Sequence, residues 1–172
     1  MTFTLYDEEA HMEEFIQLNM DYVGWIANQV LERYGIDFED TMGMTIEEYC
    51  RSKCEEFSSI SENDGALFIV EEEGTVIGMG ALTRYDEHVG EIQRMYLKPE
   101  FRGRGHGKKL LERLVNLGRE TGYTALRLDT GGFMDAAQYV YEKVGFKKIP
   151  EYTKSEVPIP LRHHWLYMEL KL

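Results

Sequence analysis

The chain of 172 residues is poor in cysteine and has no long apolar run. Cys50 and Cys54 stand four residues apart, and no further metal-binding side chains gather near them, so we expect reduced structural thiols and no metal site. Apolar runs such as Ala66–Val70 fall far below the roughly 20 residues that a transmembrane helix needs. Residues 1–12 carry acidic side chains and lack the basic and apolar stretches of a signal peptide. We therefore expect a cytoplasmic protein that does not use a membrane.

Positive charge is also scarce, because 19 Lys and Arg stand against 31 Asp and Glu, for a formal net charge of -12. Binding to nucleic acid depends on Lys and Arg that neutralise phosphates, so we do not expect a nucleic-acid partner. The basic side chains are concentrated in residues 98–113, which have a net charge of +4 and leave -16 for the rest of the chain. This segment indicates a site for a small anion, although a solvated helix face would show the same charges.

Internal repeats and low-complexity segments are missing, and a hydrophobic content of 43% suffices for a sizeable core, so residues 1–172 are predicted to form one domain. Apolar periodicity predicts a helix over residues 8–34, with bends or ends at Gly24 and Gly35, and a capping box at Thr45–Glu48 begins a second helix. The remaining pattern predicts helices over 105–121 and 133–144, and strands over 3–6, 66–72, 75–84, 90–97, 124–130, 146–149 and 165–172.

This order of elements predicts a mixed α/β sheet with helices on both faces. Gly78 and Gly80 fall inside a predicted strand, which indicates a bulge or a close approach of another backbone. The last predicted strand alternates, with Leu166, Met168, Leu170 and Leu172 on one face and Trp165 and Tyr167 on the other.

The basic segment contains a glycine-rich turn between a predicted strand and a predicted helix. Such a turn points several free N–H groups at one place, and the helix dipole adds positive character there. Glycines let the backbone approach phosphate oxygens, and the basic side chains add charge-assisted hydrogen bonds. The residues of this loop are Arg102, Gly103, Arg104, Gly105, His106, Gly107 and Lys108.

Two other phosphate-binding patterns fit this loop less well. A P-loop requires a glycine five residues before Gly107, where Arg102 stands, and Ser or Thr after Lys108, where Lys109 stands. The dinucleotide pattern Gly-x-Gly-x-x-Gly fails at Lys108 and lacks a leading βαβ unit.

The loop resembles the acetyl-CoA motif of the GNAT acetyltransferases, Arg/Gln-x-x-Gly-x-Gly/Ala, in which Arg102, Gly105 and Gly107 take the defined positions. A second segment resembles the family's later motif, because Tyr141 precedes Gly145-Phe146 in the Tyr-x-x-x-Gly-Phe pattern. Together the two matches span roughly residues 75–150 and are similar to bacterial single-domain members. One departure is Met134, which stands where many members carry an Asn that contacts the cofactor, so we do not expect that contact.

The resemblance implies a GNAT fold, with a mixed, mostly antiparallel sheet of six to seven strands and helices on both faces. Residues 1–60 would hold the acceptor-side helices, residues 66–150 the acetyl-CoA-binding core, and residues 161–172 the C-terminal strand. It also implies that acetyl-CoA is the co-substrate and that a primary amine attacks it directly in a ternary complex. The implied cofactor contacts are Met95, Tyr96, Leu97, Ala137 and the loop from Arg102 to Lys108, with one backbone N–H near Met95–Leu97 serving the oxyanion.

Two residues are candidates for proton transfer. We expect Glu91 to be the base, because a glutamate base stands at the same distance from the loop in the histone-acetylating branch of the family; residues 86–88 and a water relay are alternatives. We expect Tyr141 to protonate the leaving thiolate, as the resemblance implies. Tyr139 lies two positions away on the same predicted helix and would therefore point elsewhere. For Glu91 a strand-edge carboxylate, and for Tyr141 a buried structural tyrosine, are the plain alternatives.

Other polar and aromatic residues allow less specific predictions. His106 is expected to supply a backbone N–H, and His163 and His164 to serve packing or surface roles. Tyr22 and Trp25 either belong to a helix core or line the acceptor pocket.

The sequence leaves the acceptor open between a small amine and a peptide, and the negative charge outside the loop favours a cationic one. A non-catalytic acyl-CoA-binding module, acting as a sensor or partner protein, is the alternative function. A homodimer is left open.

Overall fold

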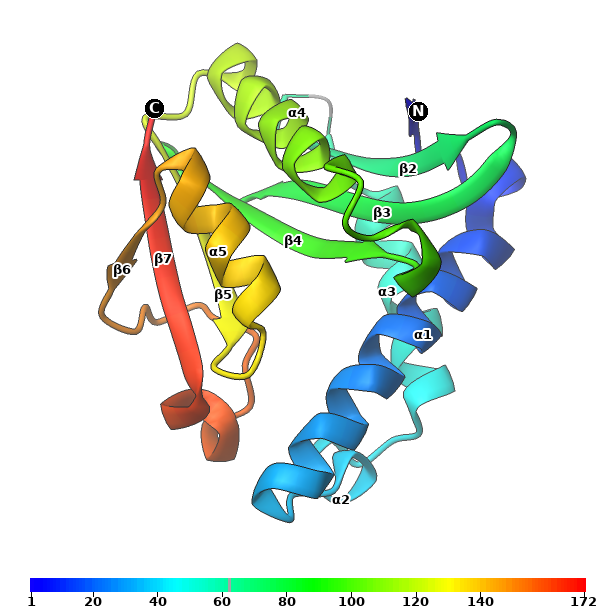
Figure 1. The fold of residues 1–172 in the computed structure, drawn as a ribbon, viewed down its shortest axis with the longest axis vertical. Helices are drawn as coiled ribbons and strands as arrows, with labels where there is room; N and C mark the ends of the chain where they lie inside the picture. Colours follow the sequence, from blue (N-terminus) through cyan, green and yellow to red (C-terminus); the bar gives the residue numbers. More distant parts are fainter. Residues whose placement is uncertain (62) are drawn as a thin grey trace.

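The structure, a computed structural model, describes residues 1–61 and 63–172 and contains a seven-stranded sheet (Figure 1). The strand order is β1-β2-β3-β4-β5-β7-β6, and all neighbouring pairs are antiparallel except β4 and β5. The predicted mixed, mostly antiparallel sheet is therefore confirmed. The strands are β1 Thr2–Leu5, β2 Ala66–Glu72, β3 Thr75–Arg84, β4 Val89–Leu97, β5 Ala125–Gly131, β6 Lys147–Ile149 and β7 Trp165–Lys171.

Helices cover both faces of this sheet (Figure 1). The helices α4 and α5 pack on one face, and α1 and α3 pack on the other. Between β6 and β7 the chain crosses through a short 3-10 helix, Ile159–His164, and another, Pro99–Phe101, follows β4. The α-helices are α1 Glu8–Tyr34, α2 Phe38–Met42, α3 Ile46–Ser58, α4 His106–Thr121 and α5 Asp135–Val144.

Local capping explains where the first helices begin and end. The Asp7 side chain accepts a hydrogen bond of 2.9 Å from the Ala10 N–H at the start of α1, and Gly35 ends that helix in the left-handed conformation. The predicted capping box of Thr45 and Glu48 is present at the start of α3. Helix α1 continues through Gly24, so the predicted end at that residue is wrong, whereas the predicted end at Gly35 is confirmed. The five-residue α2 was not predicted, because it is too short for apolar periodicity.

Two apolar cores hold the layers together. Helix α4 turns an apolar stripe toward the sheet, in which Leu110, Leu111 and Leu114 have no exposed surface. These leucines pack against the sheet with Ile92 and Leu126, while α1 and α3 form the second core on the opposite face. Both cysteines are free and buried, Cys54 within the second core, which agrees with the prediction of structural thiols.

The two central strands, β4 and β5, separate after a short parallel ladder (Figure 1). Their pairing ends at Glu91 and Arg127, although β4 continues to Leu97 and β5 to Gly131. The divergence coincides with a bulge in β4, where the register to β3 shifts and Arg94 adopts a left-handed φ of 55°. A bulge bends its strand and increases the local twist, so β4 follows β3 and moves away from β5.

The predicted close approach at Gly78 is confirmed. A Cβ atom at this position would overlap the carbonyl oxygen of Tyr96 on β4. The predicted bulge is also present, because the register shift lies between Met79 and Ala81, beside Gly80. These glycines let β3 stay paired with β4 across the bulge.

Two glycine-to-alanine changes should have opposite effects on stability. Gly24→Ala should raise the free energy of unfolding by up to about 1 kcal/mol, because Gly24 lies in a helix interior with open space around its missing Cβ. Gly78→Ala should lower it by about 1–3 kcal/mol, since the new methyl group must displace backbone of β4. Urea unfolding of both variants measures the difference, and equal effects would contradict this account of the β3–β4 ladder.

Candidate active site between β4 and β5

The glycine-rich loop forms an open N–H cradle at the start of α4. Gly103 and Gly105 have φ values of 77° and 82°, which favour glycine, and Gly105 caps α4 without any side-chain hydrogen bond. In the described part of the chain, the backbone N–H groups from Gly103 to Lys108 make no hydrogen bond. These free donors lie near the positive end of the helix dipole, an arrangement that suits an anion.

The basic side chains of the loop are exposed and only weakly held. The Arg102 Nε donates to the Leu97 carbonyl oxygen at 2.8 Å, which ties the loop to the end of β4. The Arg104 guanidinium lies 3.6 Å from the Glu72 carboxylate, and Lys108 pairs with Glu112 at 3.3 Å. Exposed ion pairs of this kind contribute little free energy, so these cations remain available to a bound anion.

The His106 side chain takes no part in the cradle. It is buried with its Nε2 atom 3.1 Å from the Glu72 Oε1, in an orientation that does not give a hydrogen bond. The imidazole does not line the cavities described below. The backbone N–H is thus the group that His106 presents to the loop, as the prediction requires.

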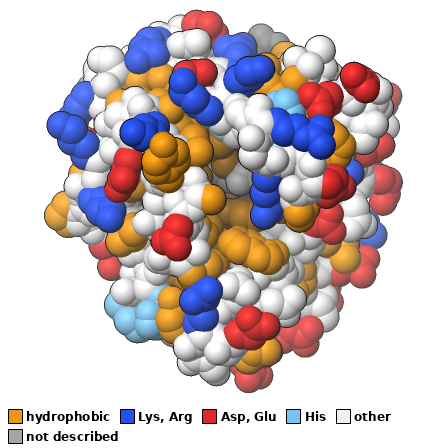
Figure 2. All heavy atoms as spheres, viewed as in Figure 1, with side chains coloured by type: hydrophobic (Ala, Val, Ile, Leu, Met, Phe, Trp, Pro, Cys, Tyr) orange, Lys and Arg blue, Asp and Glu red, His pale blue; other side chains and the backbone are white. Residues whose placement is uncertain are grey.

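A cavity occupies the gap between β4 and β5, and we call it the central cavity. Figure 2 shows this face hollowed where the two strands diverge, with apolar side chains inside and Lys and Arg side chains around the upper rim. Beyond Glu91, β4 has no β5 partner, so its backbone groups on this edge are free. The lining residues are Tyr22, Ile92, Gln93, Arg94, Met95, Asp129, Tyr141 and Glu156.

Of the predicted site residues, Met95 and Tyr141 reach the central cavity. Tyr96 and Leu97 lie farther along β4, toward the loop, and the Arg102 guanidinium sits 5.4 Å from the centre of the Tyr96 ring. Ala137 packs on α5 against the same core as Tyr141. Met95 and Tyr141 thus meet at the central cavity, and β4 runs from that cavity through Tyr96 and Leu97 to the loop, whereas Glu91 lines a different cavity.

Tyr141 points into the molecule and Tyr139 points out. Their relative exposures are 7% and 62%, which confirms the predicted helix phase. Tyr141 lines the central cavity, and burial and neighbouring charges, not a hydrogen bond, set its surroundings. Burial raises the pKa of Tyr141, so the hydroxyl keeps its proton at neutral pH. Met134 begins the same helix without a side-chain capping bond.

Glu91 is buried, and both of its carboxylate oxygens are occupied. Oε1 accepts a hydrogen bond of 2.7 Å from the Tyr152 hydroxyl, and Oε2 accepts one of 2.7 Å from the Gln93 amide. Burial raises the pKa of Glu91, which these two hydrogen bonds oppose. Its side chain borders a second cavity beside the central one, and Gln93 lines both. The alternative Asp86 instead binds the N–H groups of its own turn.

Asp129 is a site residue that the sequence analysis missed. It lies on β5 just beyond the end of the parallel ladder, and its side chain lines the central cavity. The Ser155 hydroxyl donates to Asp129 Oδ2 at 3.1 Å. Burial, reinforced by the nearby charge of Glu91, raises the pKa of Asp129 to about 7. A carboxylate in a strand that is otherwise mostly apolar is the sequence signal that marks this position.

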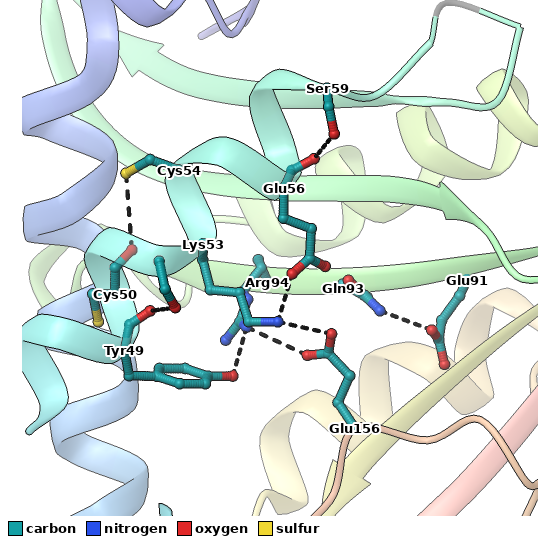
Figure 3. Close-up of polar contacts among 11 residues, drawn as sticks. Tyr49, Cys50, Lys53, Cys54, Glu56, Ser59, Glu91, Gln93, Arg94 and Glu156 are labelled. Carbon is teal, nitrogen blue, oxygen red and sulfur yellow. Dashed lines mark hydrogen bonds and ion pairs between the residues drawn. The ribbon is translucent and has the colours of Figure 1, made fainter. Parts of the chain in front are cut away.

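A group of charged side chains joins the central cavity to α3 (Figure 3). The Glu156 carboxylate bridges Lys53 at 2.9 Å and Arg94 at 3.5 Å, and Arg94 also donates to the Tyr49 hydroxyl at 2.8 Å. The Arg94 side chain is only 9% exposed, and its left-handed backbone costs about 1–3 kcal/mol. These contacts hold Arg94 in the bulge, and none of them was predicted from the sequence.

An apolar pocket adjoins the central cavity and shares Arg94 and Glu156 with it. It lies between α1, α2, α3 and residues 156–165, and its walls include Val23, Ile26 and Trp165. Tyr22 lines the central cavity, whereas Trp25 is partly exposed and packs on Phe133. Only the first of these two predicted candidates thus reaches the site.

The two remaining candidates, His163 and His164, pack against neighbouring rings. His164 stacks on the Tyr34 ring with centroids 3.6 Å apart, and His163 lies beside it. Among the described residues, no group of three or more His, Cys, Asp or Glu side chains is placed to hold a metal ion. No helix among the described residues is long and apolar enough to cross a membrane.

Comparison with known proteins gives the family. The model of the acetyltransferase (GNAT) family matches residues 27–146. The Escherichia coli K12 protein described as uncharacterized N-acetyltransferase YjgM is 32% identical over 127 residues, which cover 72% of this chain and 74% of that protein. This chain belongs to the GNAT acetyltransferase family. The membership predicted from the loop and from Tyr141 is therefore confirmed.

Solved structures agree with the fold of this GNAT acetyltransferase. The PaiA N-acetyltransferase of Thermoplasma acidophilum, in complex with coenzyme A, has a TM-score of 0.72 at 22% identity and covers 99% of this chain and 98% of its own. The structure of yncA from Salmonella typhimurium with its cofactor acetyl-CoA has a TM-score of 0.67 at 18% identity, covering 100% and 94%. Both were crystallised with the cofactor or its product, which is consistent with the predicted co-substrate.

The raised pKa of Asp129 predicts a pH-dependent stability of this acetyltransferase. Because the folded state binds this proton more tightly than the unfolded state does, the stabilisation is present below about pH 4 and is lost as the pH rises toward 7. Asp129→Asn removes the charge, so it should be more stable than the wild type at pH 8, and the difference should shrink toward pH 4. Denaturant unfolding at several pH values measures this, with the exposed Asp40→Asn as a control. A variant that is less stable at pH 8 would contradict the shift.

Proposed function

We propose that this chain transfers an acetyl group from acetyl-CoA to a primary amine, by direct attack of the amine in a ternary complex. The observation that carries the proposal is the physical continuity of three features: the open N–H cradle, the unpaired edge of β4 and the central cavity. An anionic head, a polar linear arm and a small acyl end would fit these features in that order. Acetyl-CoA has this shape and charge.

The residues available to the cofactor follow from this placement. The N–H groups from Gly103 to Lys108 would hold the pyrophosphate, with charge-assisted bonds from Arg102 and Arg104. The free backbone groups of β4 around Met95–Leu97 would pair with the amide groups of the arm, as a neighbouring strand would. Met95 would place the thioester at the cavity, and Ala137 on α5 would border the arm.

Two protons must move during the reaction. The amine loses a proton as it attacks, and a free alkyl amine has a pKa of about 10, so a base must accept that proton. Glu91, the base predicted from sequence, lies beside the central cavity and takes part in this step through its charge. The leaving thiolate receives its proton from Tyr141, whose hydroxyl is buried, protonated and free of other partners.

The acceptor is proposed to be an amine with an apolar body. Among the described residues, Asp129 and Glu156 line the central cavity and Glu91 lies beside it, against the cations Arg94 and Lys53. The carboxyl groups outnumber these cations, so the site favours an ammonium group. The adjoining apolar pocket would hold the rest of the acceptor. A module that only binds acyl-CoA is the competing function, but it would have no use for a free tyrosine hydroxyl and buried carboxylates at the acyl end.

Removing the two arginines of the loop tests the cofactor site. Arg102→Ala with Arg104→Ala should weaken CoA binding by about 3–6 kcal/mol, since charge-assisted hydrogen bonds contribute about 1.5–3 kcal/mol each. Isothermal titration calorimetry with CoA gives the affinity, and Arg119→Ala at the far end of α4 serves as a matched control. Unchanged affinity in the double variant would remove the loop from the cofactor site.

The two tyrosines of α5 test the acid. Tyr141→Phe should lower kcat by about 10²–10⁴-fold with little change in CoA affinity, because it removes the proton donor and keeps the ring. Tyr139→Phe should leave kcat almost unchanged, since that side chain is exposed. Steady-state kinetics of CoA release compare them, and a reversed ranking would show that another group protonates the thiolate.

A further inference from the structure

Two buried carboxyl groups lie near the gap between β4 and β5, but they face different spaces. Asp129 on β5 lines the central cavity together with Tyr141 and Met95, so it faces the place proposed for the thioester. Glu91 on β4 borders the second cavity and does not line the central one. A general base must come within hydrogen-bond reach of the proton that it removes, so this geometry separates the two residues.

The two carboxylates also differ in their hydrogen bonds. Both oxygens of Glu91 accept hydrogen bonds, from Tyr152 and Gln93. Asp129 uses only Oδ2, for the Ser155 hydroxyl, and within the described residues Oδ1 accepts no hydrogen bond. A carboxylate with one anchored and one open oxygen is held in position and can still accept a proton.

We propose that Asp129 is the catalytic base that accepts the proton of the attacking amine, and that Glu91 is a positioning residue that acts through it. This inference rests on the proposed acetyl transfer and identifies the atom that receives the proton. Glu91 influences Asp129 by its charge from across the end of the parallel ladder, and Gln93 links the two spaces.

The surroundings suit Asp129 to this task. Its pKa, raised to about 7, leaves enough carboxylate at neutral pH and gives it a stronger affinity for a proton than an ordinary aspartate has. Several neighbours set this value. Burial and the carboxylates raise it, whereas the Ser155 hydroxyl and the Arg94 guanidinium lower it. The titratable and charged groups facing Asp129 are Tyr22 from α1, Glu91 and Arg94 from β4, Tyr141 from α5, Tyr152 and Glu156 from the segment after β6, and Tyr167 from β7.

The proton and bond changes balance with these two residues. The bound ammonium group first releases one proton to solvent. The amine nitrogen then forms a bond to the acetyl carbon, and the proton that it loses on attack passes to Asp129 Oδ1. The carbon–sulfur bond breaks, and the sulfur takes the Tyr141 hydroxyl proton to give a free thiol. Solvent then carries the proton from Asp129 back to the Tyr141 oxygen, which restores the starting state without any further reactant.

A purely structural Asp129 would anchor Ser155 and the segment after β6 without moving a proton. Asp129→Asn keeps an acceptor for that hydroxyl and removes the base, so it separates the two roles. We expect kcat/KM to fall by about 10²–10⁴-fold for an alkyl amine, with CoA affinity unchanged. The loss should be much smaller for an acceptor of low pKa such as methoxyamine, which is neutral at pH 7 and whose attacking nitrogen loses its proton more readily. Unfolding curves check the fold, and the exposed Asp40→Asn is the matched control.

Two further variants should move the pH profile in opposite directions. Glu91→Gln removes a negative charge beside Asp129, so the rise of kcat/KM should shift to lower pH. Ser155→Ala removes a hydrogen bond that stabilises the carboxylate, so the rise should shift to higher pH. A residue with only a structural role would not produce this pair of opposite shifts.

The outcomes distinguish this inference from the function on which it rests. An active wild type with the expected loss in Asp129→Asn and the two opposite shifts supports the proposal. An active wild type whose Asp129→Asn variant keeps its kcat/KM and pH profile overturns it, and a greater loss in Glu91→Gln would assign the base to Glu91. A wild type that binds CoA but acetylates no amine would overturn the proposed function itself.

Discussion

The separation of β4 from β5 is the constraint on which the rest of the site depends. The parallel ladder ends at Glu91 and Arg127, and beyond it β4 presents an edge without a partner. The bulge at Arg94 accompanies this divergence, and its left-handed backbone is unfavourable for a residue with a side chain. The contacts of Arg94 with Tyr49 and Glu156 offset that cost. Helix α3 and the segment after β6 therefore keep the gap open from outside the sheet.

The gap brings together groups that are remote in the sequence. Strand β4 leads from the central cavity to the glycine-rich loop, and the Arg102 bond to Leu97 fixes the loop to the strand end. From β5 comes Asp129, and from α5 comes Tyr141, so a proton acceptor and a proton donor face one cavity from different elements. Burial raises the pKa of both residues and thereby suits one to accept a proton and the other to keep its own until it is needed. A mostly antiparallel sheet with one incomplete parallel pair thus supplies both a binding edge and a reaction cavity.

The sequence predicted the features that depend on local patterns. Periodicity and spacing predicted the bounds of β2 and β3 and the Thr45 capping box. They also predicted that Tyr141 is buried and Tyr139 is not, and the structure confirms all of these. The loop was recognisable because its glycines and arginines are adjacent in the chain. Asp129, Arg94 and Glu156 were not identified, because their roles arise only when β4, β5 and the segment after β6 meet in space. The Glu91 assignment rested on the distance in sequence to the glycine-rich loop in one branch of the family, which says nothing of the neighbour across the gap.

The most direct test of the account is mass spectrometry of the products formed from acetyl-CoA and a panel of amines. A primary amine with an apolar body and its tertiary counterpart, which has no proton to lose, form the central pair. The account predicts an N-acetylated product and an equal amount of free CoA from the primary amine, and neither from the tertiary one. A wild-type chain that binds CoA tightly but forms no acetylated amine with any member of the panel, small or peptide, would contradict it.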